Sequence, residues 1–265
     1  MACYIINKVH KWVRWIVPIC LLAFFPVSLS AQVGEYRNNL AVGFNAGYML
    51  SNVTFTPEVP QNYLGGVTGG LSLRYTSEKY FNSICALVME VNYAQAGWNE
   101  NILDQNDERV YYVDDVEKTD PLYYKRRLTY IQVPFLARMG WGRERKGFQF
   151  FFQIGPQVGC FLNESTDCNI REGVATQTQR VSPVVAQESM AVEKKVDYGI
   201  SGGIGLEYSH PKIGHFLIEG RYYFGLGNIY GNSKSDYFAK SNQSSIIVKD
   251  SYLFDIMKTK NSKIK

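Results

Sequence analysis

A period-two alternation of apolar and polar residues, repeated in eight segments, is the feature that most limits how this chain can fold. In the first segment, Leu40, Val42 and Phe44 alternate with Gly43 and Asn45. Side chains of a β-strand point alternately to opposite faces, so a strand between an apolar and a polar environment shows this period. The sequence therefore predicts an all-β fold. The eight segments are Asn39–Leu50, Gly65–Thr76, Asn82–Trp98, Lys125–Gly140, Gly147–Leu162, Lys195–Tyr208, His215–Leu226 and the less regular Ser244–Phe254.

The connections between these segments alternate in length. The short ones are residues 77–81, 141–146 and 209–214, and the longer ones are residues 51–64, 99–124, 171–193 and 228–243. Consecutive antiparallel strands place all the short connections at one end and all the long ones at the other. Outer-membrane barrels have this asymmetry, with short periplasmic turns and longer external loops. We therefore expect an eight-stranded antiparallel up-and-down transmembrane β-barrel over residues 32–254, in the outer membrane.

The N-terminal segment has the composition of a secretory signal peptide. Basic residues at Lys8, Lys11 and Arg14 precede the apolar run 15–25, and small residues follow at 27–31. An apolar run of this length is too short to span about 30 Å of hydrocarbon, so a signal peptide over residues 1–31 is predicted. Its removal lowers the net charge from +4 to +1. A nearly neutral chain disfavours a nucleic-acid partner.

Two kinds of barrel fit eight alternating strands. A secreted lipocalin-like barrel turns its apolar face inward, whereas a membrane barrel turns it outward. Several segments exceed the nine to eleven residues that a tilted membrane strand needs, and the polar face holds almost no lysine. Aromatic residues gather near the strand ends, as interfacial girdles require. These observations favour the membrane barrel.

Charges of both signs lie on the polar face. In a narrow barrel this face lines the lumen, where side chains fill the space and opposite charges can pair. We expect these residues to seal the lumen by ion pairs, with a solute path as the alternative. The predicted lumen cluster consists of Arg74, Glu90, Arg138, Glu207, Glu219 and Arg221.

Several runs resemble the PorT-like outer-membrane β-barrel family. They are residues 128–136 (LTYIQVPFL), 154–159 (IGPQVG), 197–208 (DYGISGGIGLEY) and 219–226 (EGRYYFGL). The resemblance implies an outer-membrane barrel with an N-terminal signal. The founding member of that family is linked to protein secretion through the outer membrane. Barrel motifs alone do not transfer such a role, because fold does not imply function.

The C-terminal end departs from the usual pattern of such barrels. They usually stop at a terminal aromatic residue, for which Phe254 is the candidate, but a polar, basic tail follows over residues 255–265. Asp250 also falls in register with Ile246 and Val248, which are expected to face lipid. A carboxylate on that face has an energetic cost that depends on depth. Either Asp250 lies near an interface or the register shifts there.

Catalytic and metal-binding residues are hard to assemble from this sequence. His210 and His215 both fall at a short periplasmic turn, which favours two turn histidines over a Ser-His hydrolase.

Other motifs also have simpler structural explanations. The acidic stretch Asp104–Asp120 contains a fragment of a calcium-binding pattern without its glycine and closing Glu, so a solvated loop is predicted. The glycines of residues 199–205 lack a following helix and indicate barrel wall. Cys85, Cys160 and Cys168 are expected to be unpaired, with a Cys160–Cys168 pair across the base of a loop as the alternative.

The sequence thus predicts a non-enzymatic barrel of structural or interaction type, without cofactors. Its expected partners are outer-membrane lipid and lipopolysaccharide, together with envelope or secretion-system proteins at the long loops. Two alternatives stay open: a small-solute conduit or lipid-modifying enzyme, and the lipocalin-like ligand carrier.

Overall fold

Eight long strands form the body of the protein in a computed structural model, which describes residues 35–80, 82–114, 120–144, 146–171, 173–231 and 237–258. Every strand predicted from the alternation is present. The predicted signal peptide, residues 1–31, lies outside the described residues. The strands are β1 (Glu35–Thr56), β3 (Leu64–Tyr80), β4 (Ser83–Glu100), β5 (Tyr124–Gly142), β6 (Gly147–Cys168), β7 (Val196–His210), β8 (Gly214–Asn228) and β9 (Lys240–Met257); a short β2 (Gln61–Asn62) and a short helix α2 (Ala186–Ser189) lie in the long connections.

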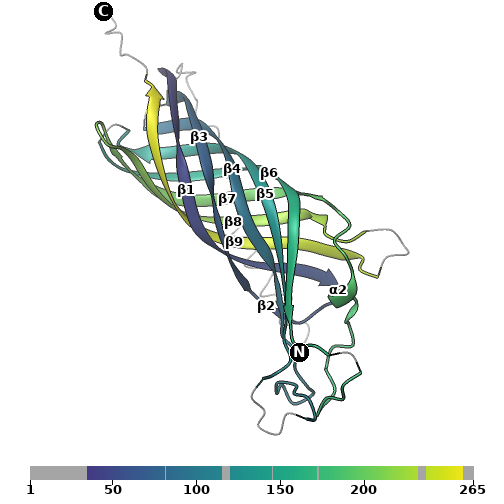
Figure 1. Ribbon diagram of the computed structural model, residues 1–265. Helices are drawn as coiled ribbons and strands as arrows, with labels where there is room; N and C mark the ends of the chain where they lie inside the picture. Colours follow the sequence, from purple (N-terminus) through teal and green to yellow (C-terminus); the bar gives the residue numbers. More distant parts are fainter. Residues whose placement is uncertain are drawn as a thin grey trace, which may run out of the picture. The chain divides into compact units, whose positions relative to one another are not determined.

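The eight long strands close into a ring of antiparallel pairs. Each pairs with its neighbour in sequence, β4 pairs with β5, and β1 pairs with β9 to complete the closure. Figure 1 shows the short turns at the end where β9 finishes, and β2, α2 and the long loops at the opposite end. Hydrocarbon offers the backbone no hydrogen-bond partner, so a sheet can span a membrane only when it has no free edge. The predicted eight-stranded barrel is confirmed.

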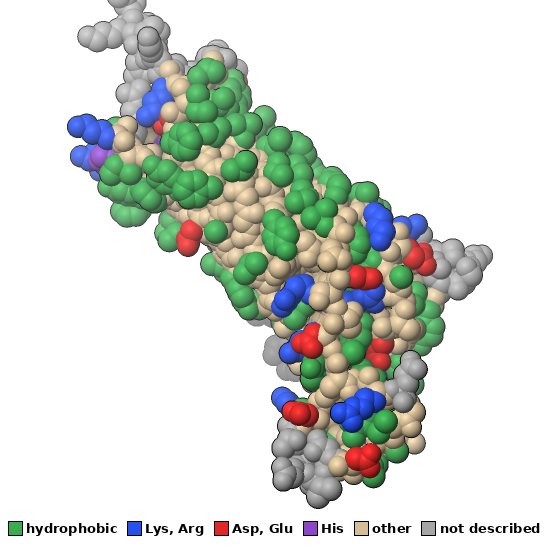
Figure 2. Space-filling model, viewed as in Figure 1, with side chains coloured by type: hydrophobic (Ala, Val, Ile, Leu, Met, Phe, Trp, Pro, Cys, Tyr) green, Lys and Arg blue, Asp and Glu red, His purple; other side chains and the backbone are tan. Residues whose placement is uncertain are grey.

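The outward face of the barrel is apolar. Leu71 is 69% exposed and Ile218 is 63% exposed, although both lie in the middle of long strands. Figure 2 shows hydrophobic side chains spread over the barrel wall, whereas many charged side chains lie towards the end with the long loops. A lipocalin-like barrel would have the reverse arrangement. The apolar outward face therefore rejects that alternative.

The strands continue past the apolar belt at the loop end. Tyr93 on β4 pairs with Ile131 on β5, and both face outward. Beyond this pair the outward positions become polar, with Gln95 on β4 and Arg127 on β5. The sequence prediction followed the apolar alternation, so it placed the outer ends of several strands too early in the chain. Strand β6, for example, was expected to stop at Leu162 but continues to Cys168. Among the described helices, none is long and apolar enough to cross a membrane, a finding that does not bear on β-barrels.

The space inside the strands is filled in three layers. At the periplasmic end, the end with the short turns, ion pairs surround a small apolar group of Ala41, Phe151, Leu217 and Leu253. Charged and amide side chains fill the middle. At the outer end, an apolar core that includes Trp98, Tyr130, Tyr230 and Phe238 joins the strands to the long loops. The barrel is thus filled by side chains in its middle and at its outer end rather than hollow.

Strand β9 is regular, although its sequence is not. Ile246, Val248, Asp250 and Phe254 are all exposed on the outward face. The register shift with β1 lies between Leu40 and Ala41, close to the strand's end, and not beside Asp250. Asp250 therefore faces outward, next to Ala46 of β1 and Ile218 of β8. β9 runs on to Met257, beyond the position where the sequence prediction ended the barrel.

Candidate functional site

A balanced ion-pair cluster fills the middle of the lumen. We call it the mid-lumen cluster: Glu90 of β4, Glu219 and Arg221 of β8, and Lys249 of β9. The Arg221 guanidinium donates to both carboxylate oxygens of Glu90, at 2.9 and 3.0 Å, and its Nη2 lies 2.6 Å from Glu219. Lys249 Nζ lies 2.6 Å from Glu90 and 3.2 Å from Glu219. Two cations therefore neutralise two carboxylates, all nearly fully buried.

Amide side chains extend the mid-lumen cluster across the barrel. Gln153 of β6 donates to Glu219 at 2.6 Å, and Asn92 donates to Glu90 at 2.9 Å. Asn45 of β1 in turn donates to Asn92 and to Ser72 of β3. Buried charges are costly unless their hydrogen-bonding capacity is met, and these amides meet part of that need, although the Nε–H of Arg221 has no partner among the described residues. The cluster links residues from β1, β3, β4, β6, β8 and β9 into one network.

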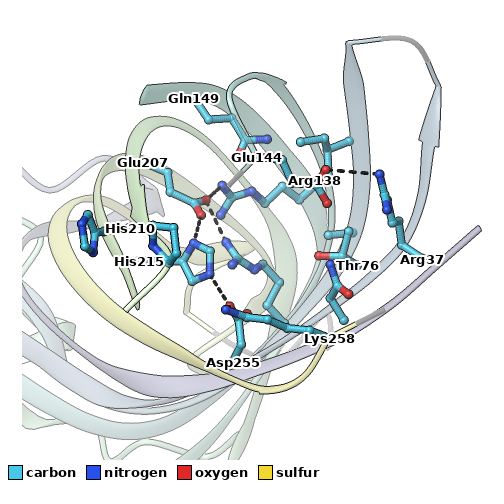
Figure 3. A pocket seen from close by; sticks show the side chains of 15 residues that line it. Arg37, Thr76, Arg138, Glu144, Gln149, Glu207, His210, His215, Asp255 and Lys258 are labelled. Atoms are coloured by element: carbon cyan, nitrogen blue, oxygen red, sulfur yellow. Dashed lines mark hydrogen bonds and ion pairs between the residues drawn. The ribbon is translucent and has the colours of Figure 1, made fainter. Parts of the chain in front are cut away.

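A second cluster lies at the periplasmic end, and Figure 3 shows most of its members. We call it the periplasmic cluster: Arg74, Arg138, Glu207, His215 and Asp255. Arg74 Nη1 lies 2.7 Å from Glu207, and Arg138 pairs with the same carboxylate oxygen. His215 bridges the two acids, with Nδ1 2.7 Å from Glu207 and Nε2 3.0 Å from Asp255. The Arg138 guanidinium lies 3.7 Å from the centroid of the Phe151 ring, a cation–π distance.

Ser209 adjoins the periplasmic cluster, so that a serine, a histidine and an acid are in contact there. Ser209 Oγ lies 2.9 Å from His215 Nδ1, and Asp255 contacts the opposite ring nitrogen. In a hydrolase the histidine nitrogen beside the serine must accept the hydroxyl proton. Here that nitrogen also faces the Glu207 carboxylate at 2.7 Å, which favours a proton on it. Ser209 is moreover fully buried. The contacts of Ser209, His215 and Asp255 therefore fit an ion-pair network and do not fit nucleophilic catalysis by Ser209.

The six charges predicted to line the lumen all lie in it, but they divide between the two clusters. Glu90, Glu219 and Arg221 meet in the middle, while Arg74, Arg138 and Glu207 meet at the periplasmic end. Sequence reasoning missed three further members: Lys249, His215 and Asp255. The alternation in β9 did indicate that Lys249 faces the lumen, because its neighbours Val248 and Asp250 face outward. The interpretation of His215 as a turn residue was wrong, because it is buried on β8.

A pocket of about 420 Å³ opens beside the periplasmic cluster. We call it the periplasmic pocket. It is lined by Arg37, Asn39, Arg74, Thr76, Ile84, Ala86, Arg138, Glu144, Gln149, Glu207, His210, Pro211, His215, Asp255 and Lys258. In Figure 3 the side chains of Arg138, Glu207, His215 and Asp255 form one connected group, and His210 lies apart from it.

A folded lobe covers the outer end of the lumen. We call it the outer lobe: residues 57–63, 101–114, 120–123, 169–171, 173–195, 229–231 and 237–239, with the strand ends that they join. Arg126 of β5 holds it in place, because its Nη1 donates to the backbone carbonyls of Gln187, at 3.0 Å, and of Met190, at 2.6 Å. The same guanidinium donates to Glu164 of β6 at 2.6 Å. These contacts tie the segment containing α2 to the barrel wall.

The family of the chain follows from its sequence. Residues 30–231 match the family described as outer membrane protein beta-barrel domain. The chain belongs to this family. The match spans most of the chain and includes seven of the eight long strands, so the outer membrane is the location of the barrel described above. A search of curated proteins found no match.

Solved outer-membrane barrels also align with this chain. Neisserial surface protein A is 8% identical, with 81% of this chain and 97% of that chain covered and a TM-score of 0.38. OprG from Pseudomonas aeruginosa is 12% identical, with 83% and 98% covered and a TM-score of 0.36. The protease OmpT from Escherichia coli is 10% identical, with 86% and 100% covered and a TM-score of 0.35. Similarity at this level assigns no activity to the present barrel.

The outer lobe of this outer-membrane barrel contains a buried carboxyl group, Glu100. It lies at the end of β4, where the strand has passed the apolar belt, and pairs with Gln61 of β2. Gln187 donates to its Oε1 at 3.0 Å and Trp98 at 3.4 Å. Burial raises the pKa of Glu100 to about 7, although these two hydrogen bonds oppose the shift. The carboxyl is therefore part of the contact between α2 and the barrel.

We expect the outer lobe to loosen as the pH rises. An exposed Glu100 carboxyl has its ordinary pKa of about 4.5, so the docked lobe binds more protons between that pH and about 7. Protonation then favours docking at low pH, and this contribution is lost as the pH rises through 7. Hydrogen exchange of residues 180–190, corrected for intrinsic rates, should be slower at pH 5.5 than at pH 8.5. Glu100→Gln should remove the difference; an unchanged difference in this variant would contradict the assignment to Glu100.

The acidic stretch Asp104–Asp120 lies partly in the outer lobe, and residues 115–119 are outside the described part. Asp104 is buried, contrary to the expected solvated loop. Its Oδ1 accepts hydrogen bonds from the backbone N–H groups of Asn106 and Glu108, which shape the tight turn between them. The described residues of this stretch do not form a metal-binding group. Cys85, Cys160 and Cys168 are free in the structure.

Proposed function

We propose that this outer-membrane barrel is an interaction platform: its lumen is closed to solutes, and its outer lobe binds partners outside the membrane. The folded outer lobe is the main observation that supports this proposal. Loops that merely connect strands need no core of their own, whereas these loops share an apolar core with the barrel mouth. Binding surfaces that are already ordered lose less conformational entropy when a partner binds.

The filled lumen supports a platform over a conduit. The mid-lumen cluster joins side chains from opposite walls, and each carboxylate there contacts both Arg221 and Lys249. Above it, Trp98, Tyr130 and Phe238 occupy the outer end with almost no exposed surface. An eight-stranded barrel has an interior just wide enough for side chains to fill. A solute would have to displace both layers.

Exposed apolar side chains on the outer lobe support protein partners there. Tyr63, Val113, Val181 and Tyr237 are each more than half exposed and lie beyond the strands' apolar belt. Aromatic side chains are enriched where proteins bind one another. The resemblance to PorT-like barrels makes envelope or secretion-system proteins the first partners to examine. Outer-membrane lipid and lipopolysaccharide would surround the belt itself.

Site-specific cross-linking tests the platform in its native membrane. A photoreactive amino acid at Val113 or Val181 should give discrete adducts of higher mass on irradiation. The same photoreactive residue at position 212, in the exposed periplasmic turn between β7 and β8, is the matched control and should not give those adducts.

A conductance measurement tests whether the lumen is closed. Purified barrel in planar lipid bilayers should show no stepwise conductance above the lipid background. Regular conductance steps, or identical adducts from Lys212 and the lobe positions, would refute the proposal.

A further inference from the structure

The periplasmic pocket has more positive charge than its own acids neutralise. Its lining contains four Lys and Arg side chains, Arg37, Arg74, Arg138 and Lys258, against the three carboxylates of Glu144, Glu207 and Asp255. His215 adds to the positive side when it is protonated, and both of its ring nitrogens face carboxylate oxygens. The carboxylates are shared: Arg74, Arg138 and His215 all contact Glu207. This surplus distinguishes the pocket from the mid-lumen cluster.

The mid-lumen cluster shows what sealing this barrel requires. There, two cations meet two carboxylates, and Asn92 and Gln153 donate further hydrogen bonds to these carboxylates, although the buried Nε–H of Arg221 has no partner among the described residues. At the periplasmic end, by contrast, an open pocket of about 420 Å³ adjoins the charges. Arg74 and Arg138 share one carboxylate oxygen of Glu207 beside this open space. A buried cation without full compensation is costly, so an additional anion that entered the pocket would be stabilised there.

One arginine of the pocket also has an unused donor. Arg74 is 6% exposed, and its Nη1 donates to Glu207 while its buried Nε–H has no partner among the described residues. A buried donor without a partner lowers the stability of the folded state, and a ligand oxygen would relieve that cost. Guanidinium groups pair with carboxylate and phosphate oxygens through two parallel hydrogen bonds. Arg74 is therefore suited to an oxygen anion that enters the pocket.

We propose that the periplasmic pocket binds a small organic anion, with its carboxylate or phosphate group among Arg37, Arg74 and Lys258. Ile84 and Ala86 line the same pocket and provide contact for a short apolar body. Lys258 is largely exposed at the end of the chain's described part, where it contacts Asp255 at 2.9 Å. Since the pocket lies at the end with the short turns, its anion comes from the periplasm. The source is either a free solute or the C-terminal carboxylate of a peptide.

Calorimetric titration of the folded, detergent-solubilised barrel tests this site. The probes are succinate, inorganic phosphate, the tripeptide Ala-Ala-Leu and the same tripeptide with an amidated C-terminus. We expect saturable binding of at least one free anion and at least tenfold weaker binding of the amide. Preference for succinate or phosphate would identify a solute site, and preference for the free tripeptide would identify a peptide site.

Three variants locate the binding. Lys258→Gln and Arg37→Gln should each weaken binding at least tenfold, whereas Lys212→Gln, which removes an exposed charge outside the pocket, should not. Arg74→Gln should abolish binding; its gel migration with and without boiling checks that the barrel still folds. Lys258 is exposed, so its variant tests the site even if a buried arginine proves necessary for folding. No binding of any probe, equal binding of acid and amide, or undiminished binding in Lys258→Gln and Arg37→Gln would overturn the proposal.

Discussion

Replacing Arg221 by Met should destabilise the barrel more than any other single substitution in the middle of the lumen. Arg221 contacts both Glu90 and Glu219, so its loss leaves two buried carboxylates with Lys249 as their one remaining cation. Removing one partner of a buried ion pair costs about 3–5 kcal/mol because an uncompensated charge stays behind. We expect the free energy of unfolding in urea, measured in lipid vesicles by gel migration without boiling, to fall by about this amount.

A second substitution separates the charge imbalance from the lost packing. Glu219→Gln together with Arg221→Met restores one cation for one carboxylate while leaving the same gap at residue 221. If the imbalance causes the loss, the double variant should be more stable than Arg221→Met alone, which a double-mutant cycle measures directly. The stability of Arg221→Lys should lie between that of the unchanged protein and that of Arg221→Met, since lysine keeps the charge but loses the two-pronged contact with Glu90. Equal stability of the single and double variants would show that packing, not charge, dominates.

The alternation of side chains predicted which face of each strand lines the lumen, and that much of the candidate site followed from sequence. Arg74, Glu90, Arg138, Glu207, Glu219 and Arg221 all face inward as expected. The partners did not follow, because Arg74 and Glu207 are 133 residues apart and meet only through the closed register of the barrel. The two-residue period of a strand determines which face of the sheet a residue lies on. It does not determine how far along the barrel axis that residue lies relative to a residue on the opposite side of the lumen.

Other residues were missed for local reasons. Lys249 lies beside the outward-facing Asp250, which made β9 look irregular, and Asp255 was assigned to the tail although it contacts His215 on the inner face. The outer lobe could not be predicted from the alternation of side chains, because its loops have no periodicity. Their ordered structure comes from tertiary contacts such as those of Arg126. Patterning therefore predicted the wall of the barrel well and the contents of its outer end poorly.

Arg126→Met should release the outer lobe without unfolding the barrel. The Arg126 side chain is 4% exposed and donates to two backbone carbonyls near α2, to Glu164, and to the Tyr230 hydroxyl at 3.3 Å. Methionine can fill part of the space but donates no hydrogen bond, so these buried acceptors lose their partner. A loss of about 3 kcal/mol in docking corresponds to roughly a hundredfold rise in the population of the open lobe.

Trypsin cleavage measures that opening, because Arg180 and Lys194 lie in the segment that Arg126 holds. Cleavage of a transiently opened segment follows its open population when closing is faster than cutting, so the rate at these two sites should rise by about two orders of magnitude. Arg127→Met is the matched control: Arg127 is the next residue of β5, faces outward and is exposed, so its replacement should leave cleavage nearly unchanged. Gel migration without boiling should stay that of a folded barrel in both variants, since Arg126 takes part in the strand pairs through its backbone, which the substitution keeps, and the mid-lumen cluster does not involve it. If Arg126→Met instead left the lobe resistant to trypsin, the apolar core alone would be sufficient to hold it, and the ordered surface on which the interaction platform rests would not depend on this arginine.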